Sequence, residues 1–242
     1  MGTVARMNTV TIGARFNGPD GSANGGYARG AVASLIDGPA RVRLSRPPPL
    51  DQPLRVREGV AEGELQVFEG EHLVATAVPW QLRDDLPDPP SFEQARAGET
   101  NYRGFTGHIY PRCFVCGPER DHGDGLRIFA GSVPDYARIV ASTWQPTPDM
   151  RDAQGHVDPR MVWAALDCPS YFALDVDPGR GFLLGQMAAQ LEPNIPGDAP
   201  LVVYAWAGPR DRRKHHAAAA LADAQGRVWA RAEHVWIELN PS

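Results

Sequence analysis

The chain alternates between short segments with a two-residue hydrophobic period and two longer segments rich in small apolar residues. Alternation bounded by Gly, Pro, Asn and Asp is typical of β-strands. It predicts strands over residues 9–16, 40–45, 54–59, 64–68, 73–82, 125–130, 136–144, 182–191, 201–207, 216–222 and 228–239. Residues 27–36 and 159–174 have helical length, so each half of the chain is predicted to contain one helix.

The two halves repeat the order of strand, helix and several strands. Residues 70–80 (GEHLVATAVPW) align without a gap with residues 226–236 (GRVWARAEHVW). A proline-rich stretch, DDLPDPP, separates the halves and indicates a stiff linker. We therefore predict a first domain over residues 1–86, a linker over 87–118 and a second domain over 119–242. Repeats of this length indicate duplicated domains that pack as the halves of a symmetric dimer do.

The composition is that of a globular protein, with 242 residues, 43% of them hydrophobic, and a net charge of -5 at pH 7. The negative charge gives no general attraction to phosphate backbones, so we expect no nucleic-acid partner. We expect no membrane association, because the sequence has no apolar run near the roughly 20 residues that span a bilayer. The first 16 residues contain no secretory signal core, and three cysteines suit a reducing compartment, so a cytoplasmic protein is predicted.

Three segments carry a resemblance to a known group of proteins. They are residues 16–33 (FNGPDGSANGGYARGAVA), 113–128 (CFVCGPERDHGDGLRI) and 162–173 (VWAALDCPSYFA). With the repeated strand and helix order, they resemble a double-hotdog acyl-CoA thioesterase-like protein of the thioesterase superfamily. The resemblance implies an α+β fold, a tandem hotdog, with two antiparallel sheets that are each wrapped round a central helix and continue across the chain.

The resemblance also implies where a site lies. In many single-domain hotdog thioesterases, His-Gly-Gly opens the helix and an acidic residue follows eight positions after the first Gly. Here residues 24–26 read Asn-Gly-Gly, and Ala33 stands at the acidic position. In the second half, Pro159 replaces the first Gly and has no N–H to donate, whereas Asp167 stands at the acidic position. One composite site of Gly25, Gly26 and Asp167 is therefore implied, and the mirror site is expected to be inactive.

Thioester hydrolysis needs a donor for the charge that develops on the carbonyl oxygen and a group that activates water. The N–H groups of Gly25 and Gly26 at a helix start meet the first need. Asn24 either caps the helix or contacts the substrate. Asp167 lies in an apolar stretch, so burial should raise its pKa toward that of a general base. Alternatively, Asp167 caps a new turn that begins at Cys168.

Further candidates are polar or aromatic residues near this predicted site. Asn17 precedes the glycine loop, where related enzymes place a residue that orients water, but it also fits an ordinary turn. Gln186 resembles a strand position that holds a polar catalytic partner in some double-hotdog thioesterases. Tyr27, Trp163 and Tyr171 are expected to line an acyl tunnel between the two helices.

One basic run contains Arg210, Arg212, Arg213 and Lys214. Coenzyme A carries phosphates that arginine binds in a bidentate manner, so Arg213 and Lys214 are candidate substrate contacts. The alternative is a solvated turn before the final hairpin.

Cys113 and Cys116 form a Cys-x-x-Cys pair, which requires a test for metal binding. Structural zinc sites usually have four ligands, and the remaining candidates Cys168, His108 and His122 complete no standard spacing. We therefore predict no metal and interpret the pair as a buried turn.

The sequence therefore predicts a hydrolase that acts on an acyl-CoA or related acyl thioester, with no cofactor other than the coenzyme A of its substrate. Two alternatives stay open. One is a non-catalytic acyl-thioester binding or regulatory protein, and the other is an enoyl-thioester hydratase on the same fold, for which residues 121–124 (DHGD) are the local candidate. The fused halves allow a monomer, while free sheet edges favour a homodimer.

Overall fold

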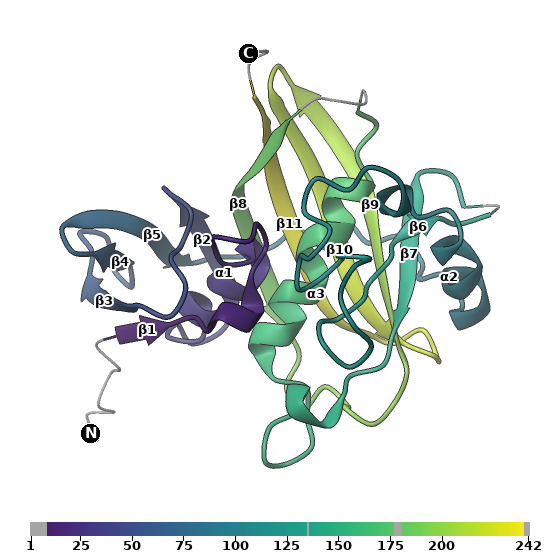
Figure 1. Cartoon of the computed structure of the whole chain (residues 1–242), viewed down its shortest axis with the longest axis horizontal. Helices are drawn as coiled ribbons and strands as arrows, with labels where there is room; N and C mark the ends of the chain where they lie inside the picture. The colour runs from purple at the N-terminus through teal and green to yellow at the C-terminus, as the bar shows by residue number, and fades with distance from the viewer. Residues whose placement is uncertain (1–8, 135, 177–180, 240–242) are drawn as a thin grey trace.

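The computed structural model describes residues 9–134, 136–176 and 181–239, and its central feature is one antiparallel sheet (Figure 1). Eleven strands form it in the order β1-β3-β4-β5-β2-β8-β11-β10-β9-β7-β6. In chain order the strands are β1 (Thr9–Thr11), β2 (Ala40–Leu44), β3 (Pro53–Glu58), β4 (Leu65–Glu69), β5 (His72–Pro79), β6 (Gly131–Ser132), β7 (Ile139–Trp144), β8 (Phe182–Leu191), β9 (Leu201–Asp211), β10 (Lys214–Asp223) and β11 (Val228–Glu238).

Strands from the two halves of the chain meet at β2 and β8. The register pairs Ala40 with Ala189 and Arg43 with Gln186. This pairing joins the strands of both halves into one continuous sheet, in agreement with the expectation that the two sheets continue across the chain.

Helices α1 (Gly25–Ala33) and α3 (Pro159–Phe172) pack against each other on one face of the sheet (Figure 1). Gly26 lies against Trp163, Ala164 and Asp167, whereas Gly30 lies against Arg160 and Trp163. A later residue of α1 therefore lies against an earlier part of α3, so the two helices run antiparallel. None of the helices within the described ranges is both long and apolar enough to cross a membrane.

Helix α2 (Phe92–Glu99) lies in the segment that the sequence suggested was only a linker. Its Ala95 packs with Val202, Tyr204 and Ala220, whereas Val203 faces the core that contains α3. Because neighbouring residues of a strand point to opposite faces, α2 covers the face of β9 and β10 that is turned away from α3. Helices on both faces explain why consecutive residues are buried at 201–205 of β9 and at 219–222 of β10. Figure 1 shows α2 beside β6 and β7 at this end of the sheet.

The largest differences from the predicted strands lie at residues 9–16 and 125–130. The first strand ends at Thr11, after which Ala14–Phe16 form a 3₁₀ turn whose N–H of Ala14 donates to the Asp51 carboxylate at 2.9 Å. Residues 125–130 form no strand, because Arg127 has a left-handed backbone with φ 53°. Leu126 and Ile128 still donate their N–H groups to the segment at residues 114–115.

Candidate active site

The carboxylate of Asp167 lies directly over the start of α1. Asp167 belongs to α3, and its Oδ2 accepts a hydrogen bond from the N–H of Gly26 at 2.7 Å. A Cβ atom on Gly26 would lie 2.5 Å from Cβ of Asp167 and 2.6 Å from the Trp163 carbonyl oxygen. Glycine is therefore required for the two helices to approach this closely. The positive end of the α1 dipole also favours a negative charge at this point.

Asn24 both caps α1 and contacts Asp167. Its side-chain oxygen accepts the N–H of Tyr27 at 2.9 Å, and its Nδ2 donates to Oδ2 of Asp167 at 3.3 Å. The structure thus contains the cap that the sequence offered as one option. The alternative cap by Asp167 is absent, because α3 continues through Pro169 to Phe172 without a new helix start.

The ionisation of Asp167 reflects its burial. Burial raises the pKa of Asp167 to about 6, whereas the positive charge of Arg29 and the hydrogen bonds from Gly26 and Asn24 act in the opposite direction. Both hydrogen bonds go to Oδ2, and Oδ1 accepts none from a described residue. The site therefore holds a carboxylate with one oxygen fixed and the other free to take a proton near neutral pH.

The two glycine N–H groups differ in what they contact. The N–H of Gly26, expected to hold a substrate carbonyl, is instead bound to Asp167. The N–H of Gly25 has no hydrogen-bond partner within the described residues, and Gly25 is partly exposed. Gly25 is therefore the free donor of this helix start.

Arg29 is a buried cation that the sequence analysis did not identify. It is 1% exposed, and its guanidinium donates to the carbonyls of Val42 at 3.4 Å and Leu184 at 2.5 Å. Val42 and Leu184 lie on β2 and β8, so Arg29 bridges the strands that join the two halves. Burial lowers the pKa of Arg29 to about 10, and the charge of Asp167 acts against this shift. A charged residue inside the small-residue segment YARGAVA was the signal that could have identified it.

His234 is a second buried group that the sequence analysis missed. It lies on β11 and is 1% exposed, and neither ring nitrogen has a hydrogen-bond partner among the residues that the structure describes. Burial, followed by the charge of Arg29, lowers the pKa of His234 to about 3, although the nearby backbone of Ala217 and Leu166 acts the other way. His234 is two residues from each of the buried Ala232 and Trp236, so all three side chains point to the same face of β11. This spacing could have indicated that His234 faces the core.

Replacing His234 by leucine should make the protein less sensitive to acid. A histidine with a lowered folded-state pKa contributes stability above about pH 6.5 that is lost as the pH falls toward 3. From pH 7 to pH 5, wild type should lose about 2 kcal/mol more unfolding free energy than His234→Leu. Urea unfolding at both pH values measures this, with exposed His122→Leu as the control; equal losses in wild type and His234→Leu would contradict it.

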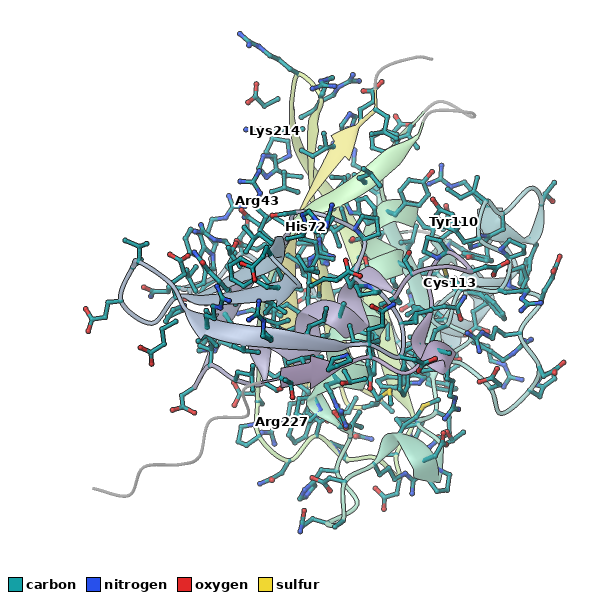
Figure 2. The ribbon with its side chains drawn as sticks, turned by 60° about the vertical axis from the view of Figure 1, so that its left-hand side comes forward. Arg43, His72, Tyr110, Cys113, Lys214 and Arg227 are labelled. Carbon is teal, nitrogen blue, oxygen red and sulfur yellow. The ribbon has the colours of Figure 1, made fainter. Side chains whose placement is uncertain are left out.

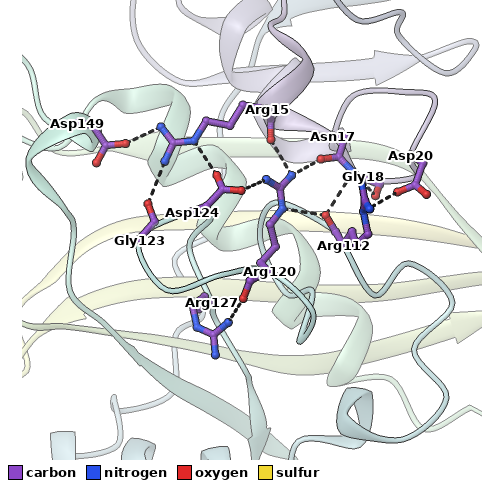
Figure 3. Close-up of polar contacts among 10 residues, drawn as sticks. All are labelled: Arg15, Asn17, Gly18, Asp20, Arg112, Arg120, Gly123, Asp124, Arg127 and Asp149. Carbon is purple, nitrogen blue, oxygen red and sulfur yellow. Dashed lines mark hydrogen bonds and ion pairs between the residues drawn. The ribbon is translucent and has the colours of Figure 1, made fainter.

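Asn17 is held in a polar network that lies outside the Asp167 contacts (Figure 3). Its Nδ2 donates to the carbonyls of Gly18 at 3.2 Å and Arg112 at 3.3 Å, and its oxygen accepts from Arg120. Arg120 also donates to the Arg15 carbonyl at 2.8 Å, which ties the loop after residue 111 to the segment before α1. These contacts fit the turn interpretation of Asn17 better than a water-orienting role.

The other polar candidates are not brought to Asp167. Gln186 precedes Met187, which belongs to the core under the helices, so the Gln186 side chain points to the opposite face of β8. Arg213 and Lys214 lie at the hairpin between β9 and β10, and Figure 2 shows Lys214 well separated from Cys113. Because Cys113 neighbours Asn24, this basic hairpin is remote from the start of α1.

The three aromatic candidates are packed against other side chains. Tyr27 is 3% exposed and stacks on Phe16 with ring centroids 3.8 Å apart, while Trp163 is 4% exposed. Tyr171 is half-buried and packs with Trp236 at the other end of α3. A surface hollow of about 560 Å³ lies elsewhere, and its lining residues are Asp37, Pro39, Pro79, Trp80 and Gln81.

The Cys113 and Cys116 pair forms the predicted buried turn, with the Gly117 N–H donating to the Cys113 carbonyl at 3.0 Å. The structure also brings Cys168 to this turn, with 3.9 Å between Sγ of Cys113 and Sγ of Cys168. Hydrogen bonds from the Cys116 and Cys168 thiols lower the pKa of Cys113.

Comparison with solved structures identifies the fold. A tesB protein from Mycobacterium avium subsp. paratuberculosis has a TM-score of 0.55 and 12% identity, over 99% of this chain and 91% of that one. The acyl-CoA thioesterase II of Mycobacterium marinum has a TM-score of 0.54 and 11% identity, over 91% of each chain. A protein of unknown function with a hotdog fold from Alicyclobacillus acidocaldarius has a TM-score of 0.57 and 12% identity, over 100% and 96%.

No protein-family model and no curated protein sequence matches the chain. The similar structures establish that the chain has the hotdog fold, which occurs in TesB-like acyl-CoA thioesterases and other thioesterase-superfamily proteins.

Proposed function

We propose that this chain is a tandem hotdog thioesterase that hydrolyses an acyl-CoA or related acyl thioester at one composite site. The observation that carries the proposal is the 2.7 Å contact between the Asp167 carboxylate and the N–H of Gly26. It joins a carboxylate from the second half of the chain to the positively polarised helix start of the first half. Solved structures of the same fold that are named thioesterases support the reaction class.

The arrangement suggests a division of labour between Gly25 and Asp167. The thioester carbonyl oxygen binds the free N–H of Gly25, which stabilises the negative charge that develops there. The N–H of Gly26 and Nδ2 of Asn24 hold Oδ2 of Asp167, and Oδ1 takes a proton from water as the water oxygen attacks the carbonyl carbon. The C–S bond then breaks, and the proton passes to the leaving thiolate, which gives a carboxylic acid and a free thiol.

The substrate has to reach a site that is nearly closed. Asp167 is 4% exposed and Asn24 3% exposed, whereas Gly25 and Cys168 are partly exposed. We infer that the acyl thioester enters beside Gly25. The coenzyme A contacts first assigned to Arg213 and Lys214 do not fit this entry point, because that hairpin lies away from it.

A non-catalytic acyl-thioester binding protein is the second candidate, and the near-complete burial of Asp167 favours it. An enoyl-thioester hydratase gains no support, because Asp121 and His122 are exposed and Asp124 is bound to Arg15 and Arg120. Acyl-CoA substrates of graded chain length, followed by free thiol release, distinguish these functions. Turnover supports hydrolysis, binding without turnover supports the binding protein, and consumption of an enoyl-CoA without thiol release supports the hydratase.

The hydrolysis rate should fall in acid because Asp167 must be ionised to accept a proton. Since burial raises its pKa to about 6, kcat/KM should decline below about pH 6. Arg29→Met removes a positive charge that favours the ionised carboxylate. The pH below which kcat/KM declines, the acid limb of the profile, should therefore rise by on the order of one pH unit. Arg29→Lys keeps the charge and should leave the limb near its wild-type position. Equal pH profiles for Arg29→Met and wild type would show that Arg29 does not act on the ionisation.

A further inference from the structure

All three cysteines of the chain meet beside the start of α1. Cys113 and Cys116 belong to the buried turn, and Cys168 lies on α3. Their Sγ atoms all lie within 4.8 Å of one another, and the Cys113 and Cys168 sulfur atoms are 3.9 Å apart. Cys168 is partly exposed as a residue, whereas Cys113 and Cys116 are buried.

The spacing of the sulfur atoms suits a tetrahedral metal site. A Zn–S bond is about 2.3 Å long, so neighbouring sulfur ligands of a tetrahedral zinc ion are about 3.8 Å apart. The 3.9 Å between the sulfur atoms of Cys113 and Cys168 matches this value. The sulfur of Cys116 lies within 4.8 Å of the other two sulfur atoms. A small rotation of its side chain would bring it to the spacing of about 3.8 Å that zinc requires.

Two side chains place an N–H donor near the sulfur atoms. Nδ2 of Asn24 lies 3.8 Å from Sγ of Cys113 and 3.9 Å from Sγ of Cys168. Nε2 of His108 lies 3.3 Å from Sγ of Cys116, while its Nδ1 accepts the N–H of Tyr110 at 2.9 Å. Because Nδ1 is an acceptor, the neutral ring carries its proton on Nε2 and donates it toward sulfur. Such outer donors stabilise thiolates, which are the form of cysteine that binds metal.

We propose that Cys113, Cys116 and Cys168 bind one zinc ion as three thiolates, with solvent as the fourth ligand. Soft thiolate ligands select zinc over magnesium or calcium. The ion would fasten the turn to α3. Spacing rules miss this site because the third ligand comes from a helix 52 residues after Cys116. The proposal does not depend on the thioesterase proposal, and its tests use no activity measurement.

The test begins with the full chain, purified without a histidine tag under reducing conditions and supplied with zinc. Mass spectrometry of the metals should give one zinc per chain, and Co²⁺ in its place should give a near-ultraviolet thiolate charge-transfer band. Replacing any one of the three cysteines by serine should weaken metal affinity by more than the roughly 10- to 100-fold of an outer-ligand change. The exposed His122→Ala variant should bind metal as wild type does.

If the serine variants fail to fold, the proposal can still be tested on wild-type protein by measuring the reactivity of its thiols. Iodoacetamide should label the partly exposed Cys168 thiol in the metal-free wild-type protein and spare it in the zinc-loaded protein. Equal labelling in both forms, or the lack of a thiolate band with Co²⁺, would overturn the proposal. A disulfide between Cys113 and Cys168 in protein kept under reducing conditions would also overturn it.

Discussion

Asp167→Asn is expected to lower kcat/KM for acyl-CoA hydrolysis by about 10²- to 10⁴-fold, the range that a positioned general base contributes. Asparagine keeps the size of the side chain and an oxygen that can accept the N–H of Gly26. It cannot take a proton from water at Oδ1. The loss should therefore appear in kcat, with little change in substrate binding. Thiol release measured over a range of acyl-CoA concentrations separates the two constants.

The matched control is Asp175→Asn, which removes an exposed carboxylate just beyond the end of α3. It should hydrolyse acyl-CoA at the wild-type rate. Undiminished hydrolysis in Asp167→Asn would move the base elsewhere in the chain. Acyl-CoA binding that persists in both variants, with no thiol release from wild type, would favour the binding protein.

The sequence predicted the two helices well because their small apolar residues and bounding turn residues are local signals. Predicted ranges 27–36 and 159–174 contain most of α1 (Gly25–Ala33) and α3 (Pro159–Phe172). Strand β8 (Phe182–Leu191) was predicted with its observed bounds. The missed helix α2 also had a local signal, the capping box of Ser91 and Gln94, which the nearby prolines obscured.

Other features depend on contacts between distant segments. The left-handed backbone of Arg127 interrupts a predicted strand. The alternation of hydrophobic and polar residues does not indicate such a backbone conformation. The meeting of Cys168 with Cys113 depends on how α3 packs against the turn. Likewise, the pairing of the Gly26 N–H with Asp167 rather than with a substrate follows from how close the helices lie. The sequence indicated that Asn24, Gly26 and Asp167 lie together. It did not indicate that Arg29 is buried beside them or that Gln186 faces away, because both depend on how distant segments pack.

Gly26→Ala is expected to destabilise the protein by about 3 kcal/mol, at the upper end of the cost of overpacking a core. The added methyl group would lie 2.5 Å from Cβ of Asp167, 2.6 Å from the Trp163 carbonyl oxygen and 3.0 Å from Cα of Ala164. Two of these three atoms belong to the backbone of α3, which cannot relieve the clash by changing rotamer as a flexible side chain can. The helices must separate, and the hydrogen bond from Gly26 to Asp167 must lengthen.

Thermal unfolding should show this as a fall in Tm of roughly 6–12 °C, since each kcal/mol corresponds to about 2–4 °C in a protein of this size. Gly21→Ala is the control, because a methyl group there meets no atom within 4 Å and the residue needs no left-handed backbone. It should change the unfolding free energy by less than about 0.5 kcal/mol. If Gly26→Ala matched this control, α1 and α3 would not be held at the observed separation, and the Asp167 contact would lose its structural basis.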